Sequence, residues 1–357
     1  MAAFLLAGVL AAILGFAAHR ASICTVRAVA ELMSSGTGHI LLGIGKSALW
    51  VGAITIPVFL LMPSARAAFG GWPLTGAAML GGLVFGVGAA INGACAFSTL
   101  ARLADGDGRM LVAGAGLGLG ALCFIMLVDW RLIDRPAPTP ALVGSLLEWS
   151  LVMAAAVLVP WGVYETARLW RTRPAGLALR ALVLAPQYRL SSAALLIGGA
   201  GAAILLIYGS SSYTVTLQQL VEGLRGKGGF PAIERWLLLL AILAGMLLST
   251  VQRGSFRLDW RPRPAWLRHA GGGLLMGMGV GLTPGGNDAL VLYGIPSLSP
   301  HALPAFFAMV VGIALGLWSM RACFGIETRV ACRNDLYFID QAPPAKKLPL
   351  AEKPPAP

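Results

Sequence analysis

The sequence predicts an all-α polytopic membrane protein, built as an inverted repeat of about nine transmembrane helices. Of the 357 residues, 57% are hydrophobic and only 12% are charged, whereas a soluble domain carries about 25% charged residues. Apolar runs of membrane-spanning length recur along the chain, and one glycine-rich pattern occurs twice. The composition therefore excludes an ordinary cytosolic protein.

Nine apolar runs are expected to cross the membrane. They cover residues 2–18, 40–62, 76–91, 110–128, 142–164, 193–208, 236–251, 271–282 and 302–320. The first run is not expected to be a cleaved signal peptide, because no basic residue precedes it and its cationic residues, His19 and Arg20, follow it.

Four stretches after or between these runs are too polar and glycine-rich for lipid and too apolar for solvated loops. They cover residues 21–38, 92–106, 210–224 and 285–299. Irregular backbone at membrane depth is stable only inside protein or along a cavity, because hydrocarbon cannot satisfy its N–H and C=O groups. We therefore predict four short re-entrant helices that form an hourglass-like pore.

Basic residues predict the orientation. The net charge of +12 fits the positive-inside rule better than a nucleic-acid partner, since the apolar chain leaves little polar surface. The basic clusters follow the fifth run (Arg168, Arg171, Arg173, Arg180, Arg189), follow the seventh run (Arg253, Arg257, Arg261, Arg263, Arg268), and occupy the tail (Arg329, Arg333, Lys346, Lys347). All three are expected in the cytoplasm, which places the N-terminus outside and the C-terminus inside.

The repeat consists of two glycine patterns in the same order. Gly81-Gly82-Leu83, Gly86 and Gly88 recur at one offset as Gly272-Gly273-Leu274, Gly277 and Gly279, which sets Cys95 opposite Gly286. A weaker match sets Ser22, Cys24, Thr25 and Val26 against Ser211, Tyr213, Thr214 and Val215. The predicted units are residues 1–130 and 190–325, joined by a linking span and basic loop (131–189), with a cytoplasmic tail (326–357) that is disordered from about residue 343. One intervening crossing inverts the second unit, as in many transporters whose substrate site lies near the midplane.

Two cysteines are the main candidates for function. Cys24 and Cys95 each lie in a predicted re-entrant stretch beside hydroxyl or amide side chains. A free cysteine usually behaves as a small hydrophobic residue, and that reading stays open for both. A thiol also offers a weak donor and a polarizable sulfur, which suits a sulfur-bearing anion. The neighbouring candidate site residues are Ser22, Thr25, Gly93, Ser98, Gly285, Gly286, Asn287 and Asp288.

Asp288 has two interpretations. An acid in a membrane segment is a functional candidate by default, but this one also suits a local helix cap. Cys123, Cys323 and Cys332 are predicted to be structural, and the cysteine spacing makes no metal motif. No Walker motif is visible, and His19, His39, His269 and His301 lie near predicted span ends, which indicates interfacial placement. We expect no cofactor and no metal.

Three segments carry a family resemblance. They are Arg20-x-Ser22-x-Cys24, then Gly93-x-Cys95 followed by a stretch through Leu103 and Gly106, and a late segment from Gly285-Gly-Asn-Asp through Tyr293-Gly to Leu298-Ser299. Over nearly the whole membrane portion the chain resembles the YeeE/YedE-type sulfur transporters, whose characterised activity is thiosulfate uptake. The resemblance implies an hourglass-like inverted repeat in which Cys24 is the inner relay thiol and Cys95 the central one. The third cysteine of the family falls at Gly286 and is absent here.

The predicted function is inward transport of a small sulfur-containing anion, thiosulfate or a related compound, across a bacterial plasma membrane. The expected partners are this anion, the lipid bilayer and a soluble sulfur-carrier protein at the cytoplasmic loops. Restoring the third thiol by Gly286→Cys is expected to improve thiosulfate uptake. Two alternatives are a thiol oxidoreductase using Cys24 and Cys95, although no CxxC motif occurs, and a membrane anchor subunit, which has no need of broken helices.

Overall fold

A computed structural model describes residues 2–62, 70–134, 137, 139–140, 145–172, 179–261, 266–326, 328–333 and 335–339. The tail beyond residue 339, including the part predicted to be disordered, lies outside the described residues.

Nine long helices make up most of the described chain: α1 (Ala2–Ala21), α3 (His39–Leu61), α4 (Gly76–Asn92), α6 (Arg109–Asp129), α7 (Ser145–Arg171), α9 (Leu190–Tyr208), α11 (Ile233–Arg253), α12 (Trp266–Leu282) and α14 (Ala302–Phe324). The shorter helical elements are α2 (Thr25–Ser35), α5 (Ala96–Ala104), α8 (Leu179–Val183), α10 (Tyr213–Leu224), α13 (Asn287–Ala289) and the π-helix η2 (Leu290–Gly294). Two antiparallel strand pairs complete the described residues, β1 (Gly70–Gly71) with β2 (Thr139–Pro140), and β3 (Val330–Arg333) with β4 (Leu336–Ile339).

The helices confirm a multi-pass membrane protein, with one difference in the count. Among the described residues, eight helical segments are long and apolar enough to cross a membrane, against the nine expected. The remaining predicted span, residues 271–282, lies in α12, which has 17 residues and is therefore about 25 Å long at 1.5 Å per residue. α12 packs between α4 and α6.

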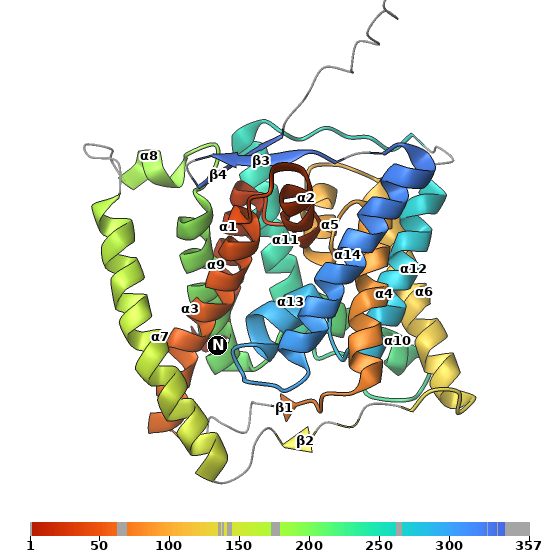
Figure 1. Ribbon diagram of the computed structural model, residues 1–357, viewed down its shortest axis with the longest axis horizontal. Coiled ribbons are helices and arrows are strands. Elements are labelled where there is room, and N and C mark those ends of the chain that lie inside the picture. Colours follow the sequence, from red (N-terminus) through yellow and green to blue (C-terminus); the bar gives the residue numbers. More distant parts are fainter. Residues whose placement is uncertain are drawn as a thin grey trace, which may run out of the picture.

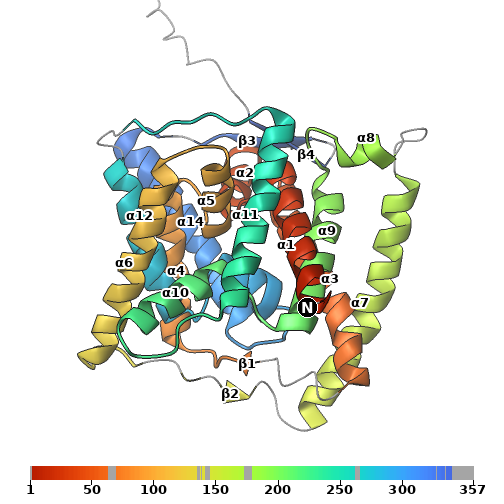
Figure 2. The same cartoon turned by 180° about the vertical axis from the view of Figure 1, so that it is seen from behind.

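The long helices form two packed groups (Figures 1 and 2). In one group α1 packs on α9 and α11, and α3 packs on α9; in the other, α4 packs on α12 and α14, and α6 packs on α12. α7 packs on α3 at the edge of the bundle (Figure 1), where Lys46 Nζ donates to Glu165 Oε1 at 2.8 Å.

Glycines let the second group pack closely. A Cβ atom on Gly82 or Gly86 of α4 would overlap the backbone of α14, and one on Gly273 or Gly277 of α12 would overlap the backbone of α6. Small residues that allow backbones to approach are typical of helix contacts in membranes. The repeated glycine pattern therefore specifies two equivalent helix contacts.

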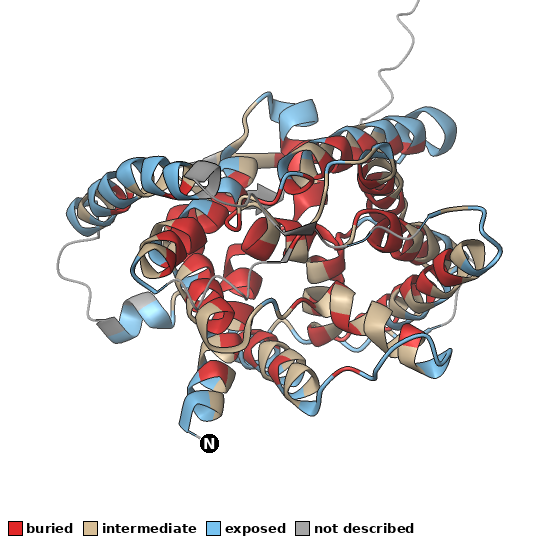
Figure 3. Ribbon diagram, turned by 90° about the horizontal axis from the view of Figure 1, so that it is seen from below, coloured by how far each residue is buried: buried red, intermediate tan, exposed pale blue. Residues whose placement is uncertain are grey.

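The buried residues lie toward the centre of the bundle, and the exposed residues lie around its outside (Figure 3). Large apolar side chains stand on that outer surface, such as Leu61, which is 82% exposed, and Leu267, which is 78% exposed. Exposed apolar area of this extent marks a surface that another apolar phase covers. For helices of this length and composition, that phase is lipid.

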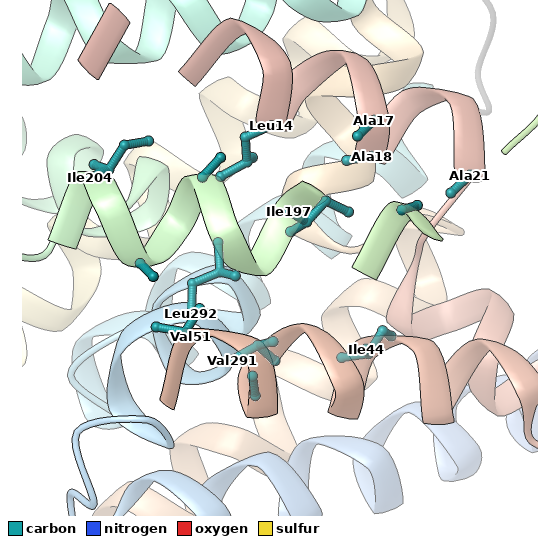
Figure 4. Close-up of a cluster of buried hydrophobic side chains, with 14 of the residues drawn as sticks. Leu14, Ala17, Ala18, Ala21, Ile44, Val51, Ile197, Ile204, Val291 and Leu292 are labelled. Carbon is teal, nitrogen blue, oxygen red and sulfur yellow. The ribbon is translucent and has the colours of Figure 1, made fainter. Parts of the chain in front are cut away.

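A core cluster fixes the position of η2. Leu14 of α1, Ile44 and Val51 of α3, and Ile197 of α9 surround Val291 and Leu292 of η2 (Figure 4). The two η2 residues are 7% and 8% exposed. This packing holds α13, which directly precedes η2, near the middle of the bundle.

Short helices occur in all four stretches where the sequence predicts them. α2 and α5 lie in one half of the bundle, together with β3, β4 and α8, while α10 lies toward the other end, near β1 and β2 (Figures 1 and 2). The fourth stretch differs from a plain α-helix, since α13 has three residues and continues as a π-helix. Irregular helix of this kind often marks a functional position.

Candidate functional site

A small cavity brings together residues of three of the four predicted re-entrant stretches with residues of α1, α3 and α9. Its volume is about 50 Å³, and its polar lining consists of Cys24, Thr25, Ser47, Cys95, Asn287 and Asp288. The rest of the lining is apolar, including Ile44, Ile197, Val291 and Leu292. Five of the ten predicted site residues therefore share one cavity.

Cys24 occupies the N-cap of α2 in an extended backbone conformation. Its side chain is buried, and Ser98 Oγ of α5 donates a hydrogen bond to Cys24 Sγ at 3.1 Å. The bond joins α2 to α5 across the cavity. It places the predicted residue Ser98 beside a thiol, although Ser98 itself does not line the cavity.

Cys95 occupies the equivalent N-cap of α5, also in an extended conformation. Its carbonyl oxygen accepts hydrogen bonds from Thr99 N and Thr99 Oγ1, both at 2.9 Å. Cys24 and Cys95 are both buried, and both are free thiols. The two sulfur atoms thus stand at the starts of two short helices that open on the same cavity.

A buried polar pair supports the loop before Cys95. Asn92 Nδ2 donates to Ala94 O at 2.9 Å and to Thr99 Oγ1 at 3.0 Å. Its Oδ1 accepts from His269 Nδ1 of α12 at 2.9 Å; because an amide oxygen only accepts, the proton of the ring lies on Nδ1. This pair was not predictable from sequence pattern, since the contact joins residues 177 positions apart.

Three of the four histidines lie near helix ends but inside the bundle. His19, His269 and His301 are all buried, at 4%, 1% and 2% exposure, because each has a polar partner inside the bundle. His301 Nδ1 lies 2.9 Å from Ser299 Oγ, and His19 Nε2 donates to Asp105 Oδ1 at 3.1 Å. Only His39 is exposed.

Asp288 bonds to the start of α10. Ser212 Oγ donates to Asp288 Oδ2 at 2.8 Å, and Thr214 Oγ1 donates to Asp288 Oδ1 at 2.7 Å. Thr214 N also points to Oδ2, at 3.4 Å. The carboxylate therefore does cap a helix, but a helix distant in sequence, and it also lines the cavity with the thiols.

Gly286 has no space for a side chain. A Cβ atom there would lie 2.7 Å from Thr214 Cγ2 and 2.8 Å from Thr214 Oγ1. Gly286 N donates to Thr214 Oγ1 at 3.1 Å. Next to it, Asn287 Nδ2 donates weakly to Thr25 Oγ1 at 3.4 Å, which links α13 to α2.

The four short helices begin close to this centre. Their N-caps are Cys24, Cys95, Ser212 and Gly286, and the contacts above join all four starts. A helix N-terminus carries unsatisfied N–H groups and the positive end of the helix dipole. Converging helix starts favour an anion between them.

Besides Ser98 and Gly286, three predicted residues do not line the cavity, namely Ser22, Gly93 and Gly285. Ser22 adopts φ 54°, a conformation that is uncommon for a residue with a side chain. Gly93 adopts φ 74° and is exposed, and Gly285 adopts φ 143°. They shape the turns that lead into α2, α5 and α13, whereas Thr25, Asn287 and the two cysteines contact the cavity.

A larger cavity lies beside α10, with a volume of about 390 Å³. Its lining is rich in polar groups, namely Ser210, Ser212, Gln218, Gln219, Glu222, Arg235, Tyr293, Ser297, Ser299 and His301. Arg235 Nη1 donates to Gln219 Oε1 at 2.8 Å. Ser212 lines this cavity and also contacts Asp288, so it connects the two cavities.

The basic residues near the two ends have fixed partners. Arg20 is buried, and its guanidinium donates to Ser249 Oγ, Gln252 Oε1 and Ala185 O. Arg225 and Lys227 both contact Asp129, at 3.4 and 2.9 Å. Among the described residues, no group of three or more His, Cys, Asp and Glu side chains is arranged to hold a metal ion.

Comparison with known proteins identifies the family. A family model described as sulphur transport matches residues 20–315. The chain belongs to this sulphur transport family. The match confirms the YeeE/YedE-type resemblance and the transporter class. Over 276 residues this chain is 26% identical to a protein of Spirochaeta thermophila named thiosulfate transporter TsuA. The match covers 68% of this chain and 76% of the relative.

Proposed function

We propose that the chain moves thiosulfate or a related sulfur-containing anion inward across a bacterial plasma membrane, through a constriction formed at Cys24 and Cys95. The observation that carries the proposal is the cavity of about 50 Å³ that both thiols share with Thr25, Asn287 and Asp288. The family match and the name of the relative support a sulfur compound as the substrate.

The proposed architecture is an inverted repeat of residues 1–130 and 190–325. Its support is the pairing of the helices. α1 packs on α11 as α9 packs on α3, and α4 packs on α14 as α12 packs on α6. Exchanging the two units leaves this set of contacts unchanged. The linking segment (131–189) contributes α7, which packs at the edge and takes no part in the pairing.

In this proposal the four short helices re-enter the membrane from opposite sides. α2 and α5, which begin at the two free cysteines, enter from the cytoplasm, and α10 and α13 enter from outside. Two facts support this: α2 and α5 lie toward the end that holds β3 and β4, and the start of α1 lies toward the opposite end (Figure 2). With the positive-inside rule, the C-terminal end is cytoplasmic and the N-terminus is outside.

The anion first occupies the polar cavity of about 390 Å³, where Arg235 is the cationic side chain of the lining. It then reaches the constriction, where helix starts attract negative charge and thiols act as weak donors. Thiols suit a passage because weak contacts release the anion again. A volume of about 50 Å³ holds roughly one or two water molecules, so the constriction widens during transport.

A soluble sulfur-carrier protein is the proposed recipient at the cytoplasmic end. The support is chemical: a reactive sulfur compound delivered next to basic loops favours capture by a carrier with an acidic surface. Arg27 of α2 lies 5.1 Å from the ring of Tyr337 in β4, so the strand pair borders the place where the anion leaves Cys24.

Uptake by purified protein in liposomes tests the proposal. Radiolabelled thiosulfate, sulfite, sulfide and sulfate are added outside, and the trapped label is counted against liposomes without protein. We expect saturable uptake of at least one sulfur compound, with sulfate poorly transported because it has no exposed sulfur atom for the thiols. If no compound enters faster than in empty liposomes, the transport proposal is wrong; if thiols oxidise without uptake, the oxidoreductase interpretation gains support.

A further inference from the structure

We propose that Asp288 binds one proton for each anion that passes the constriction, so that transport is coupled to protons. The proposal rests on the proposed transport function and adds to it the chemistry of the driving ion. Its basis is the geometry of three side chains: the Asp288 carboxylate, the Ser212 hydroxyl and the Thr214 hydroxyl.

Asp288 is a buried acid without a counter-charge. Its side chain is 6% exposed, and among the described residues no Lys, Arg or His forms a salt bridge with it. The titratable groups that share its cavities are Cys24, Cys95, Tyr213 and Tyr293. An ionised carboxylate in such a place is costly unless it is paired.

The position of this carboxylate conflicts with its negative charge. Asp288 lines the same cavity of about 50 Å³ as Cys24 and Cys95. A divalent anion between the thiols would therefore stand within a few ångströms of a third negative charge, in a medium that screens poorly. Protonation of Asp288 removes that repulsion. Arrival of the anion and protonation of the acid consequently favour each other, as linked binding requires.

The hydroxyl groups accommodate both protonation states. In the ionised state, Ser212 Oγ–H donates to Oδ2 at 2.8 Å and Thr214 Oγ1–H donates to Oδ1 at 2.7 Å. In the protonated state, Oδ2–H donates to Ser212 Oγ, and the Ser212 hydrogen turns to Thr214 Oγ1, which lies 2.9 Å from Ser212 Oγ. Thr214 Oγ1–H keeps its bond to Oδ1. Every hydrogen has an acceptor in each state, because hydroxyl groups rotate and serve as both donor and acceptor.

The network also connects the proton to water. Ser212 lines the polar cavity of about 390 Å³, whereas Asp288 lines the small cavity with the thiols. A proton from water in the larger cavity reaches Oδ2 next to Ser212. The step adds one proton to the carboxylate and turns one hydroxyl group; no bond of the anion changes. When the anion leaves inward, Asp288 releases the proton to the same side, and the network returns to the ionised state.

Liposomes with a pH indicator inside test the coupling on the unmodified full-length chain. The membrane potential is clamped at zero with potassium and valinomycin, and radiolabelled thiosulfate is the probe, since it carries no proton of its own near neutral pH. Because one proton enters with each anion in this proposal, we expect uptake to rise at least about fivefold when the outer pH is lowered from 8 to 6. We also expect the lumen to acidify as thiosulfate enters.

Asp288→Asn is the decisive variant, because its amide group matches the protonated acid in shape and donates to Ser212 Oγ in the same way. We expect its uptake to vary less than about twofold over that pH range, without acidification of the lumen. Asp129→Asn is the matched control, since Asp129 contacts Arg225 and Lys227 outside both cavities, and its pH dependence should equal that of the unmodified chain. Thermal unfolding of each variant checks the fold.

The possible results are distinct. Thiosulfate uptake by the unmodified chain at equal rates at pH 6 and pH 8, with no acidification, would overturn proton coupling and leave the transport proposal intact. A pH dependence that Asp288→Asn retains would assign coupling to another group and overturn the role of Asp288. If Asp288→Asn does not fold, acidification by the unmodified chain still decides whether protons move. Absence of uptake of any sulfur anion would contradict the transport function and this inference together.

Discussion

The two halves of the molecule begin short helices close to the small cavity, with different side chains at corresponding positions. In the first half Cys95 caps α5, and Asn92 before it bonds to His269 of the other half. In the second half Gly286 caps α13, and Thr283 before it donates to Ala78 O of the other half at 3.1 Å. The repeat offset that sets Cys95 opposite Gly286 also relates both of these partners. One backbone arrangement therefore supports a thiol on one side and a carboxylate with two hydroxyl groups on the other.

This difference concerns position 286, where the family resemblance implies a third cysteine and this chain has glycine. The space that a side chain at position 286 would need is occupied by Thr214, whose hydroxyl bonds to Asp288. In the first half Cys95 shares the small cavity with Cys24, whose sulfur accepts a hydrogen bond from Ser98. The second half thus has glycine where the first half has Cys95, and it places the buried acid Asp288 two residues later. In the proposed mechanism, the first half contacts the sulfur of the anion and the second half binds the proton.

The largest expected effect comes from removing the thiol of the first half. Cys95→Ala is expected to lower thiosulfate uptake at least about tenfold, equivalent to roughly 1.4 kcal/mol of barrier, because the donor at the constriction is lost. A smaller side chain at a helix cap should leave the fold intact. Cys123→Ala is the control, since Cys123 of α6 lines neither cavity, and its uptake should match the parent. Equal uptake by both variants would contradict a thiol-dependent passage.

The second effect concerns position 286, which the repeat sets opposite Cys95, and here the structure leads to a different expectation from the sequence. Gly286→Cys was expected to improve uptake, but its Cβ atom would lie 2.7 Å from Thr214 Cγ2. Overpacking of this kind typically costs about 1–3 kcal/mol, and the shift would break the bond from Thr214 to Asp288. We expect a lower unfolding midpoint and reduced uptake. A variant that also carries Thr214→Ala should recover only part of the midpoint, because it removes the overlap at position 286 but also the hydroxyl that bonds to Asp288. Improved uptake by Gly286→Cys alone would contradict this expectation.

The third effect probes the support of the two loops. His269→Ala leaves Asn92 Oδ1 without its buried donor, a loss of about 1–3 kcal/mol, and loosens the loop that holds Cys95. We expect about fivefold slower uptake and faster labelling of Cys95 by a small maleimide. A merely structural role would lower the unfolding midpoint without changing the labelling rate of the folded protein. Thr283→Val is the counterpart in the other half, and we expect it to leave Cys95 labelling unchanged.

The sequence predicted the class of protein, the four short helices and the cavity-lining pairs Cys24 with Thr25 and Asn287 with Asp288, because these depend on local composition and on the repeat. It did not predict the bond between Asn92 and His269 or the capping of α10 by Asp288, because each joins segments that only the packed bundle brings together. The predicted span at residues 271–282 lies in α12, whose glycines make contacts with α4 and α6 that appear only in the packed bundle.

The smallest expected effect concerns the far end of α5 and is a matter of stability with pH. Burial alone raises the pKa of Asp105, but hydrogen bonds from His19, Ser255 and Thr250 outweigh it and hold that pKa below its usual range. An acid whose pKa is lower in the folded state adds stability above its unfolded value of about 3.9, and this stability is lost as the pH falls through the folded value. Asp105→Asn should therefore lower the unfolding midpoint by a few degrees at pH 7 and progressively less below about pH 4. The corresponding end of the second half, around Ser299 and His301, has no such acid among its described contacts. A penalty for Asp105→Asn that is the same at pH 7 and at pH 3.5 would show that the carboxylate charge contributes nothing and that Asn replaces its bonds incompletely.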